Sequence, residues 1–320
     1  MVEKDAIEPD VWSEWLLHRR QAGDAAFAGS VRASVGQYVD RVLDAAQLSP
    51  DMVLADIGTG EGVLALRAIE RMGPGLRVLM TDISAALLQH AEAAAIERQV
   101  HRQCTFLRCP ADELSGVASN SVDAVTTRAV LAYVADKPAA LREFFRILKP
   151  GGRLSLAEPV MQDDALFASG LRAMIDTQGA RGLSPVLQLI QRWKAAQYPD
   201  TPQKIAASPI ANYSERTLYD ATRGCGFTDV HLELHIDLVP STVRTWDVFL
   251  SLAPHPWAPT LATILAEQFS VDERRVFEDA VRPIVESPSA VITTRVVYVS
   301  ARKPTNDPHA ARPIFSEFVS

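Results

Sequence analysis

Cysteine is scarce in this sequence, and long apolar runs are missing. Among 320 residues the only cysteines are Cys104, Cys109 and Cys225, and none belongs to a C-x-x-C pair. Such a small, odd and scattered set excludes a disulfide framework. No stretch approaches about 18 uninterrupted apolar residues, so we expect no membrane span and no membrane partner. The N-terminal MVEKDAIEPD is acidic and polar, unlike a secretory signal, and we therefore expect a cytoplasmic protein.

An excess of positive charge is also missing. The formal net charge is -7, with 32 Lys and Arg against 39 Asp and Glu. A weakly acidic chain lacks the basic footprint of a nucleic-acid binder, so we expect no nucleic-acid partner. The hydrophobic fraction of 48% is ordinary for a globular protein with a buried core.

Short β-prone runs alternate with helical runs in the first half of the chain. This alternation predicts an α/β fold, with a Rossmann-like, doubly wound and mainly parallel sheet. The predicted strands are 52–56, 76–81, 104–108, 122–126 and 153–158. The predicted helices between them are 63–71, 85–98 and 137–148. The run Lys149-Pro150-Gly151-Gly152 predicts a turn before the fifth strand.

The flanking regions have different patterns. Amphipathic helices are predicted at 11–21 and 25–47, a helix at 214–223 capped by Ser214 and ended by Gly226, and strands at 228–238 and 291–301. The stretches 161–209 and 241–287 read as helical. The expected organisation is an N-terminal helical segment (1–48), a core (49–159), a helical insertion (160–213), more core (214–240), a second insertion (241–289), a final core strand (290–303) and a loose tail (304–320).

The glycine run after the first predicted strand carries the main functional signal. Asp56-Ile57-Gly58-Thr59-Gly60-Glu61-Gly62 lies between a strand and a helix, where glycines let the backbone turn sharply and approach a ligand. The spacing is G-x-G-x-G. A dinucleotide fingerprint is G-x-G-x-x-G, and its third glycine would fall at Val63, so the spacing disfavours an NAD-linked oxidoreductase.

Two further elements follow at the ends of later strands. Asp82, in LMTDIS, is placed to accept hydrogen bonds from both ribose hydroxyls of an adenosine, whereas Ser84 can cap the next helix. The loop Cys109-Pro110-Ala111-Asp112 follows the third strand, where the Ala111 N–H and the Asp112 carboxylate could read an adenine edge.

These residues, together with TTRAVLAYVADKPAALREFFRILKPGGRLSLAEP, resemble the class I S-adenosylmethionine (SAM)-dependent methyltransferases. The nearest branch is the ubiquinone/menaquinone-biosynthesis and arsenite-methyltransferase-like one. The resemblance covers about 54–159. It implies SAM as cofactor, with Asp56, Gly58 and Gly60 at the methionine part, Asp82 on the ribose, Ile83 on the adenine face, Ala111 and Asp112 at the adenine edge, and Arg128 at the methionine part. The full expected cofactor set is Asp56, Gly58, Thr59, Gly60, Gly62, Asp82, Ile83, Ala111, Asp112 and Arg128.

One position departs from the family pattern. Relatives often read G-D-A where this chain has Cys109-Pro110-Ala111, so Asp112 must replace the usual carboxylate or that contact is lost. An arsenite substrate would require clustered cysteines, and the three cysteines are scattered. No metal site is predicted.

The acceptor pocket is expected outside the predicted core. The two helical insertions and the N-terminal helices are predicted to form a lid over it, with dimerisation, giving a homodimer, as the alternative role for the second insertion. All five tryptophans lie outside the core, which fits an aromatic-lined pocket for a small organic acceptor. Candidate bases are Glu158, Tyr133, Tyr213 and His18. Arg19 or Arg20 could reach the SAM carboxylate, although a solvated helix face also explains them.

The sequence therefore predicts an enzyme that methylates a small molecule by in-line displacement, releasing S-adenosylhomocysteine (SAH). The alternative is a non-catalytic SAM-binding sensor or partner protein. Both would bind SAM, and only turnover separates them. The acceptor atom stays open, because O-, N-, S- and C-methylation share this fold.

Overall fold

A single mixed sheet organises the chain. The computed structural model describes residues 8–21, 23–179, 182 and 184–305. Within them, seven strands form one sheet in the order β3-β2-β1-β4-β5-β7-β6. β7 runs antiparallel to both of its neighbours, and the other described pairs are parallel. The strands are β1 (Val53–Ile57), β2 (Arg77–Asp82), β3 (Cys104–Arg108), β4 (Val122–Arg128), β5 (Leu148–Pro159), β6 (Thr228–Pro240) and β7 (Val291–Arg302). The predicted Rossmann-like, mainly parallel fold is confirmed.

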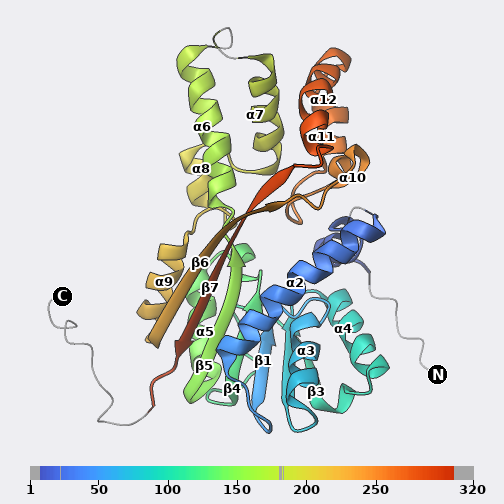
Figure 1. The fold of residues 1–320 in the computed structure, drawn as a ribbon. Helices are drawn as coiled ribbons and strands as arrows, with labels where there is room; N and C mark the ends of the chain where they lie inside the picture. Colours follow the sequence, from blue (N-terminus) through green and yellow to red (C-terminus); the bar gives the residue numbers. More distant parts are fainter. Residues whose placement is uncertain (1–7, 22, 180–181, 183, 306–320) are drawn as a thin grey trace, which may run out of the picture.

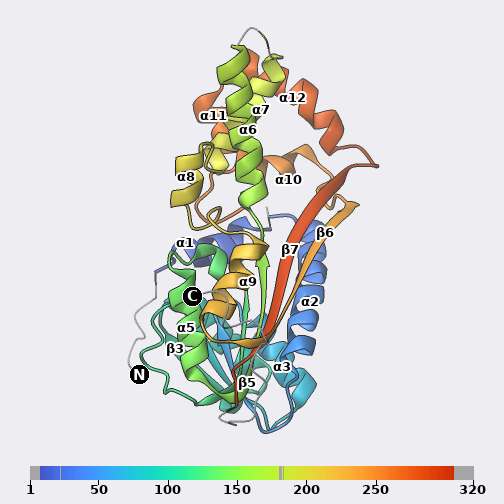
Figure 2. The ribbon, with the colours of Figure 1, turned by 90° about the vertical axis from the view of Figure 1, so that its left-hand side faces the viewer.

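Helices cover both faces of this sheet (Figures 1 and 2). One apolar core joins it to α2 (Ala25–Ala46), α3 (Val63–Met72) and α4 (Ala85–Glu97), and includes Val39, Leu66 and Met80. The other joins it to α5 (Lys137–Ile147) and α9 (Glu215–Gly224), and includes Phe144 and Leu218. Burial on both faces explains the apolar runs Val53–Ala55 in β1 and Val78–Met80 in β2.

Helix starts follow the predicted capping residues. Ser84 accepts a hydrogen bond from the Leu87 N–H at the start of α4, and Ser214 forms a capping box with Thr217 at the start of α9. Gly226, with φ +93°, follows the end of α9 as expected. Because Ser84 supplies the cap itself, the carboxylate of Asp82 is not needed for that role.

The predicted turn at 149–152 is wrong as a boundary. These residues belong to β5, which begins at Leu148. The Gly151 N–H donates to the Lys303 carbonyl, and the Lys303 N–H donates to the Gly152 carbonyl, each at 2.9 Å. These bonds keep the glycine pair in the sheet, while Gly151 takes a φ of +82°.

The second half of the chain adds a helical lobe beyond the carboxyl ends of the parallel strands (Figure 1). It consists of α6 (Gln162–Gln178), α7 (Pro185–Gln197), α8 (Pro202–Ala207), α10 (Trp246–Ser251), α11 (Leu261–Gln268) and α12 (Val271–Val285). Trp246, Ile264 and Phe277 lie in an apolar core of its own, against α7. The long β6–β7 ribbon connects this lobe to the sheet.

The N-terminal helix is shorter and less regular than predicted. α1 (Val11–Ser13) runs directly into a π-helical segment, η1 (Glu14–Arg19), where the Arg20 N–H donates to the Trp15 carbonyl at 2.7 Å. Most of MVEKDAIEPD and most of the predicted tail lie outside the described residues. Within the part of the chain that is described, every helix is too short or too polar to cross a bilayer.

Candidate functional site

The glycine loop joins β1 to α3 at the carboxyl edge of the sheet. Gly58, Gly60 and Gly62 have φ values of +64°, +57° and +76°, which L side chains rarely adopt. A Cβ on Gly58 would lie 2.4 Å from Val130 Cγ2, and one on Gly60 would lie 3.1 Å from Leu16 Cδ2. The loop therefore requires glycine for both its conformation and its close contacts.

Asp56 lies behind the glycine loop rather than in the wall of a cavity. Its carboxylate accepts hydrogen bonds from the hydroxyls of Thr59, at 2.7 Å, and Thr126, at 3.2 Å. Burial raises the pKa of Asp56 to about 6, against the opposing effect of these hydroxyls and of Arg128. The Asp56 carboxylate thus stabilises the glycine loop through its hydrogen bond with Thr59. Gly62, which directly precedes α3, is also outside the cavity wall and lies close to Ala91 of α4.

Asp82 links the second strand to the glycine loop. One carboxylate oxygen accepts the Gly60 N–H and the other accepts the Ser84 N–H, both at 2.9 Å. Burial raises the pKa of Asp82. The side chain lies at the cavity wall, with a negative charge that a hydroxyl-bearing ligand could meet.

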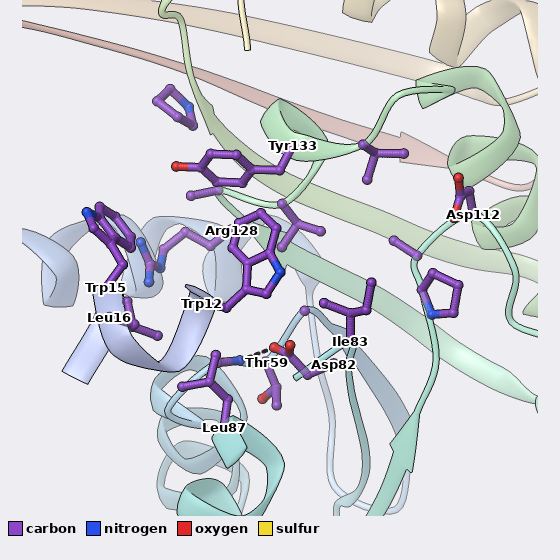
Figure 3. Close-up of a pocket in the computed structure, with 18 of the residues that line it drawn as sticks. Trp12, Trp15, Leu16, Thr59, Asp82, Ile83, Leu87, Asp112, Arg128 and Tyr133 are labelled. Carbon is purple, nitrogen blue, oxygen red and sulfur yellow. Dashed lines mark hydrogen bonds between the residues drawn. The ribbon is translucent and has the colours of Figure 1, made fainter. Parts of the chain in front are cut away.

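A cavity of about 490 Å³ lies above these strand ends. Figure 3 shows its labelled residues. We call its lower part the cofactor half; its wall contains Gly58, Thr59, Gly60, Asp82, Ile83, Leu87, Cys109, Pro110, Ala111 and Asp112. We call its upper part the aromatic half; its wall contains Trp12, Trp15, Leu16, Arg20, Arg128, Ala129, Val130, Tyr133, Val134, Ala135, Pro159, Met161, Tyr198 and Pro254.

The residues of the cofactor half match the needs of an adenosyl ligand. Tight glycine turns leave room for a ligand, and Asp82 offers an anionic acceptor. Ile83 is 50% exposed, which is unusual for a large apolar side chain at the end of a buried strand. An apolar surface beside a carboxylate suits a flat base attached to a ribose.

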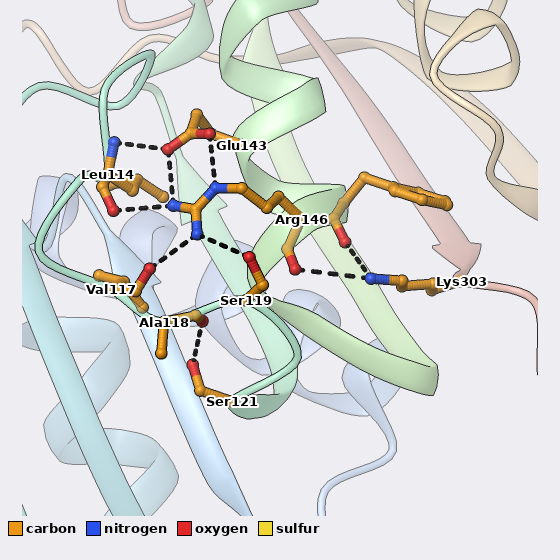
Figure 4. A network of polar contacts seen from close by, with 9 residues as sticks. Leu114, Val117, Ala118, Ser119, Ser121, Glu143, Arg146 and Lys303 are labelled. Atoms are coloured by element: carbon orange, nitrogen blue, oxygen red, sulfur yellow. Dashed lines mark hydrogen bonds and ion pairs between the residues drawn. The ribbon is translucent and has the colours of Figure 1, made fainter.

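A hydrogen-bond network fixes the loop after β3 beside the cavity (Figure 4). The Glu143 carboxylate accepts the Leu114 N–H at 2.8 Å. Arg146, one turn further along α5, donates to the carbonyls of Leu114 and Val117, each at 2.8 Å. This network anchors the loop that carries Ala111 and Asp112.

Two guanidinium groups enter the cavity from different elements. Arg128 ends β4, and Arg20 follows η1. Burial lowers the pKa of both, and the neighbouring charge of Arg128 further lowers that of Arg20, to about 10. In the described part of the chain neither makes a hydrogen bond or an ion pair, and Arg20 lies 5.8 Å from the centre of the Trp15 ring. The cavity is thus prepared for an anionic group. Of the two N-terminal candidates it is Arg20, not Arg19, that lines it.

Two aromatic rings of the cavity wall, Trp12 and Tyr133, contact each other and the ring of Trp257. The ring centres of Trp12 and Tyr133 are 5.1 Å apart, and Trp257 lies 5.6 Å from each. All three contacts are edge-to-face, which is favourable for aromatic pairs. The N-terminal helix, the core and the second insertion therefore converge here.

The 252–260 loop, between α10 and α11, is held against the N-terminal helix. The Trp15 indole N–H donates to the Ala253 carbonyl at 3.3 Å, and the Arg19 guanidinium donates to the Ala258 carbonyl at 2.9 Å. From the second insertion it is this loop, rather than the helices, that reaches the cavity. Met161 and Tyr198 reach it from the first insertion.

The structure separates the four candidate bases. Tyr133 lines the cavity. Glu158 is fully buried, and its carboxylate accepts the N–H groups of Val130 and Ala132, so it supports the backbone instead of facing a ligand. Tyr213 does not line the cavity: it is buried, its hydroxyl donates to the Pro159 carbonyl, and Lys137 lies over its ring. His18 is exposed and outside the cavity wall.

Three residues of the cavity wall, Tyr198, Met161 and Pro254, were not among the site residues predicted from the sequence. All three belong to the insertions, whose helical pattern gives no information about which side faces the core. The only local signal was the run Pro254-His255-Pro256-Trp257, which is unusually rigid for a loop.

Comparison with known proteins relates this chain to methyltransferases. Residues 48–197 fit a family model described as a methyltransferase domain. Nocamycin O-methyltransferase of Saccharothrix syringae is 30% identical over 62% of this chain and 66% of its own length. The ubiquinone/menaquinone biosynthesis C-methyltransferase of Xylella fastidiosa M23 is 31% identical over 50% of this chain and 61% of its own length. A tRNA 5-carboxymethoxyuridine methyltransferase of Escherichia coli K12 is 35% identical over 39% of this chain and 46% of its own length. The alignments thus span about half to two thirds of these relatives.

Solved structures agree on the fold. The YcgJ protein of Bacillus subtilis superposes with a TM-score of 0.52 at 15% identity, covering 84% of this chain and 99% of that one. Protein BH2331 of Bacillus halodurans C-125 gives a TM-score of 0.51 at 17% identity, covering 84% of this chain and 100% of that one.

Proposed function

We propose that this chain, which belongs to the class I SAM-dependent methyltransferases, methylates a small, largely apolar organic acceptor held in the aromatic half of the cavity. One observation carries the proposal: the cofactor half and the aromatic half form one continuous cavity of about 490 Å³. A donor in the first half would present its reactive end to an acceptor in the second.

The proposed cofactor-binding roles rest on the position of these residues in the wall of one cavity. In this proposal Asp82 accepts the ribose hydroxyls, Ile83 packs on the adenine, and Ala111 and Asp112 meet its edge. Arg128 faces the methionine carboxylate. All five residues lie in the wall of the same cavity, which supports these roles. Asp56 acts indirectly, by holding Thr59 and hence the glycine loop.

Methyl transfer depends mainly on the alignment of the acceptor with the methyl group and on the exclusion of water. Bound SAM supplies an electrophilic methyl group, which leaves its sulfur as the acceptor atom forms the new bond. The protein must align the acceptor with that methyl group and exclude water. Trp12 and Tyr133 line the aromatic half and contact Trp257, and two hydrogen bonds hold the 252–260 loop against the N-terminal helix.

A bulk nucleic-acid acceptor is disfavoured, although one relative acts on tRNA. The net charge of -7 gives no overall attraction to a phosphate backbone. The two cavity guanidiniums are buried and cannot provide an extended basic surface.

Turnover with an acceptor panel tests the proposal. The full chain is incubated with SAM and with phenols, enolisable diketones, amines or bulk tRNA, and SAH is quantified by mass spectrometry. We expect SAH formation with at least one small apolar acceptor. The Asp82→Ala variant should lose it. The Trp12→Ala variant should raise KM for the acceptor while SAH still binds. SAH binding without any turnover would instead support a non-catalytic sensor.

A further inference from the structure

A buried histidine behind the aromatic half has one ring nitrogen without a partner. His255 lies in the 252–260 loop and is 4% exposed. Its Nε2 is 2.7 Å from the Gln197 carbonyl oxygen. A carbonyl can only accept, so Nε2 carries the proton and Nδ1 keeps a lone pair. Nδ1 is buried and has no hydrogen-bond partner among the described residues. A buried acceptor of this kind requires an explanation.

The imidazole is adjacent to the cavity wall on two sides. Pro254, the preceding residue, and Tyr198 both line the aromatic half. The His255 ring centre is 5.6 Å from that of Tyr198 and 6.3 Å from that of Trp257. Tyr198 is thus the side chain that both contacts the imidazole and faces the cavity.

The loop around His255 is stiff and anchored at both ends. Pro254 and Pro256 flank the histidine and restrict its backbone. Gln197 binds the loop twice: its carbonyl accepts from His255, and its side-chain amide donates to the Pro259 carbonyl at 3.1 Å. The imidazole is therefore positioned in advance, with its tautomer fixed by Gln197.

We propose that Nδ1 of His255 accepts the proton of a phenolic or enolic acceptor, so that oxygen is the atom methylated. This inference rests on the proposed function. The O–H bond breaks, the proton forms a new N–H bond at Nδ1, and the oxygen keeps the electron pair with which it takes up the methyl group. The resulting imidazolium returns its proton to water after the product leaves. Because Nδ1 is covered by protein, the acceptor must displace the ring of Tyr198 to reach it.

Other acceptor classes fit these surroundings less well. A protonated amine would meet no carboxylate among the residues that form the wall of the aromatic half. A thiolate scarcely needs a base. A flat hydroxyl compound suits the aromatic rings of this half. Burial lowers the pKa of His255, which favours the neutral imidazole before the acceptor binds.

The experiment uses the full chain saturated with SAH and the chromogenic phenol 4-nitrophenol as the probe. In the wild type we expect the visible absorbance of the bound phenolate to appear at a pH about one unit below that of the free phenol, equivalent to a tenfold preference for the ionised form. The His255→Gln variant keeps a donor for Gln197 but has no Nδ1 lone pair. It should lose this shift while its thermal midpoint and SAH affinity stay unchanged. His255→Ala should lose both the shift and the anchoring.

A second measurement observes the two ring nitrogens of His255 directly. In ¹⁵N spectra of the wild type, the His255 resonances should show a protonated Nε2 and an unprotonated Nδ1, and 4-nitrophenol should move the Nδ1 resonance. Absence of 4-nitrophenol binding to the SAH complex, an equal shift in His255→Gln, or a protonated Nδ1 would overturn the inference. Failure of SAH to bind would instead contradict the proposed function.

Discussion

The carboxylate of Asp82 accepts the backbone N–H of Gly60 at 2.9 Å and thereby joins the end of β2 to the glycine loop after β1. Its other oxygen accepts the Ser84 N–H at the start of α4. One side chain thus positions the loop and presents a buried negative charge to the cavity. Removal of that charge should affect both functions.

Replacement of Asp82 by Asn tests the ribose assignment. Asn keeps the shape but loses the charge, and hydrogen bonds to a charged group contribute about 1.5–3 kcal/mol. We expect SAH affinity to fall by about ten- to a hundredfold, measured by calorimetry. The control is Glu113→Gln, an exposed position close by that does not line the cavity. Equal affinities in the two variants would exclude Asp82 as a ribose ligand.

A pair of glycine substitutions tests the loop geometry. In Gly58→Ala the new Cβ would meet Val130 at 2.4 Å, at a φ of +64°, so we expect a loss of stability of about 1–2 kcal/mol from the backbone conformation alone. SAH binding should weaken as well. Gly36→Ala lies inside α2 with no atom within 4 Å of its Cβ, and should stabilise the chain by about 0.5–1 kcal/mol. Thermal unfolding measures the stability of both variants. A Gly58→Ala chain as stable as the wild type would contradict the requirement for glycine at position 58.

The cofactor half was predictable because its signals are local in sequence. Glycine spacing, a strand-end acid and capping serines each depend on a few adjacent residues, and Gly58, Asp82 and Ser84 lie where the pattern placed them. Their binding roles remain predictions. The base candidates show the limit of this reasoning. Glu158 ends the expected strand, yet the turn after β4 directs two backbone N–H groups at it, and no local pattern reveals that.

The aromatic half depends on contacts between distant segments. Trp12, Tyr133 and Trp257 belong to three parts of the chain and meet only in the folded protein. The sequence indicated that tryptophans lie outside the core, but not which of them converge. The unpartnered nitrogen of His255 depends in turn on the carbonyl of Gln197, an interaction that residue type alone does not predict.

The buried carboxyl of Asp56 should make stability depend on pH. Its pKa rises from 3.8 to about 6 on folding, chiefly through burial. Its neutral form is therefore favoured in the folded chain, and this contribution is fully present below the unfolded pKa and lost as pH rises through the folded one. Relative to Asp56→Asn, the wild type should lose about 3 kcal/mol of unfolding free energy between about pH 3 and pH 7. Urea unfolding of both proteins across this pH range gives the difference between their unfolding free energies. Groups that titrate in both proteins contribute equally and cancel in this difference. A difference independent of pH would show that Asp56 ionises normally.

Arg20 and Arg19 offer a matched test of how the N-terminal helix contributes to binding. Arg20 faces the cavity without an ion-pair partner in the described chain, whereas Arg19 donates to the Ala258 carbonyl and holds the 252–260 loop. If Arg20 receives the methionine carboxylate of the cofactor, then Arg20→Met should weaken SAH binding by about tenfold, as expected for one charge-assisted hydrogen bond. It should weaken 5′-methylthioadenosine, which lacks that carboxylate, much less. Arg19→Met should affect both ligands equally, because it loosens the loop without removing a ligand contact. Calorimetry with the two ligands on the two variants gives four affinities. An equal loss for both ligands in Arg20→Met would show that this guanidinium supports the fold of the helix rather than the cofactor.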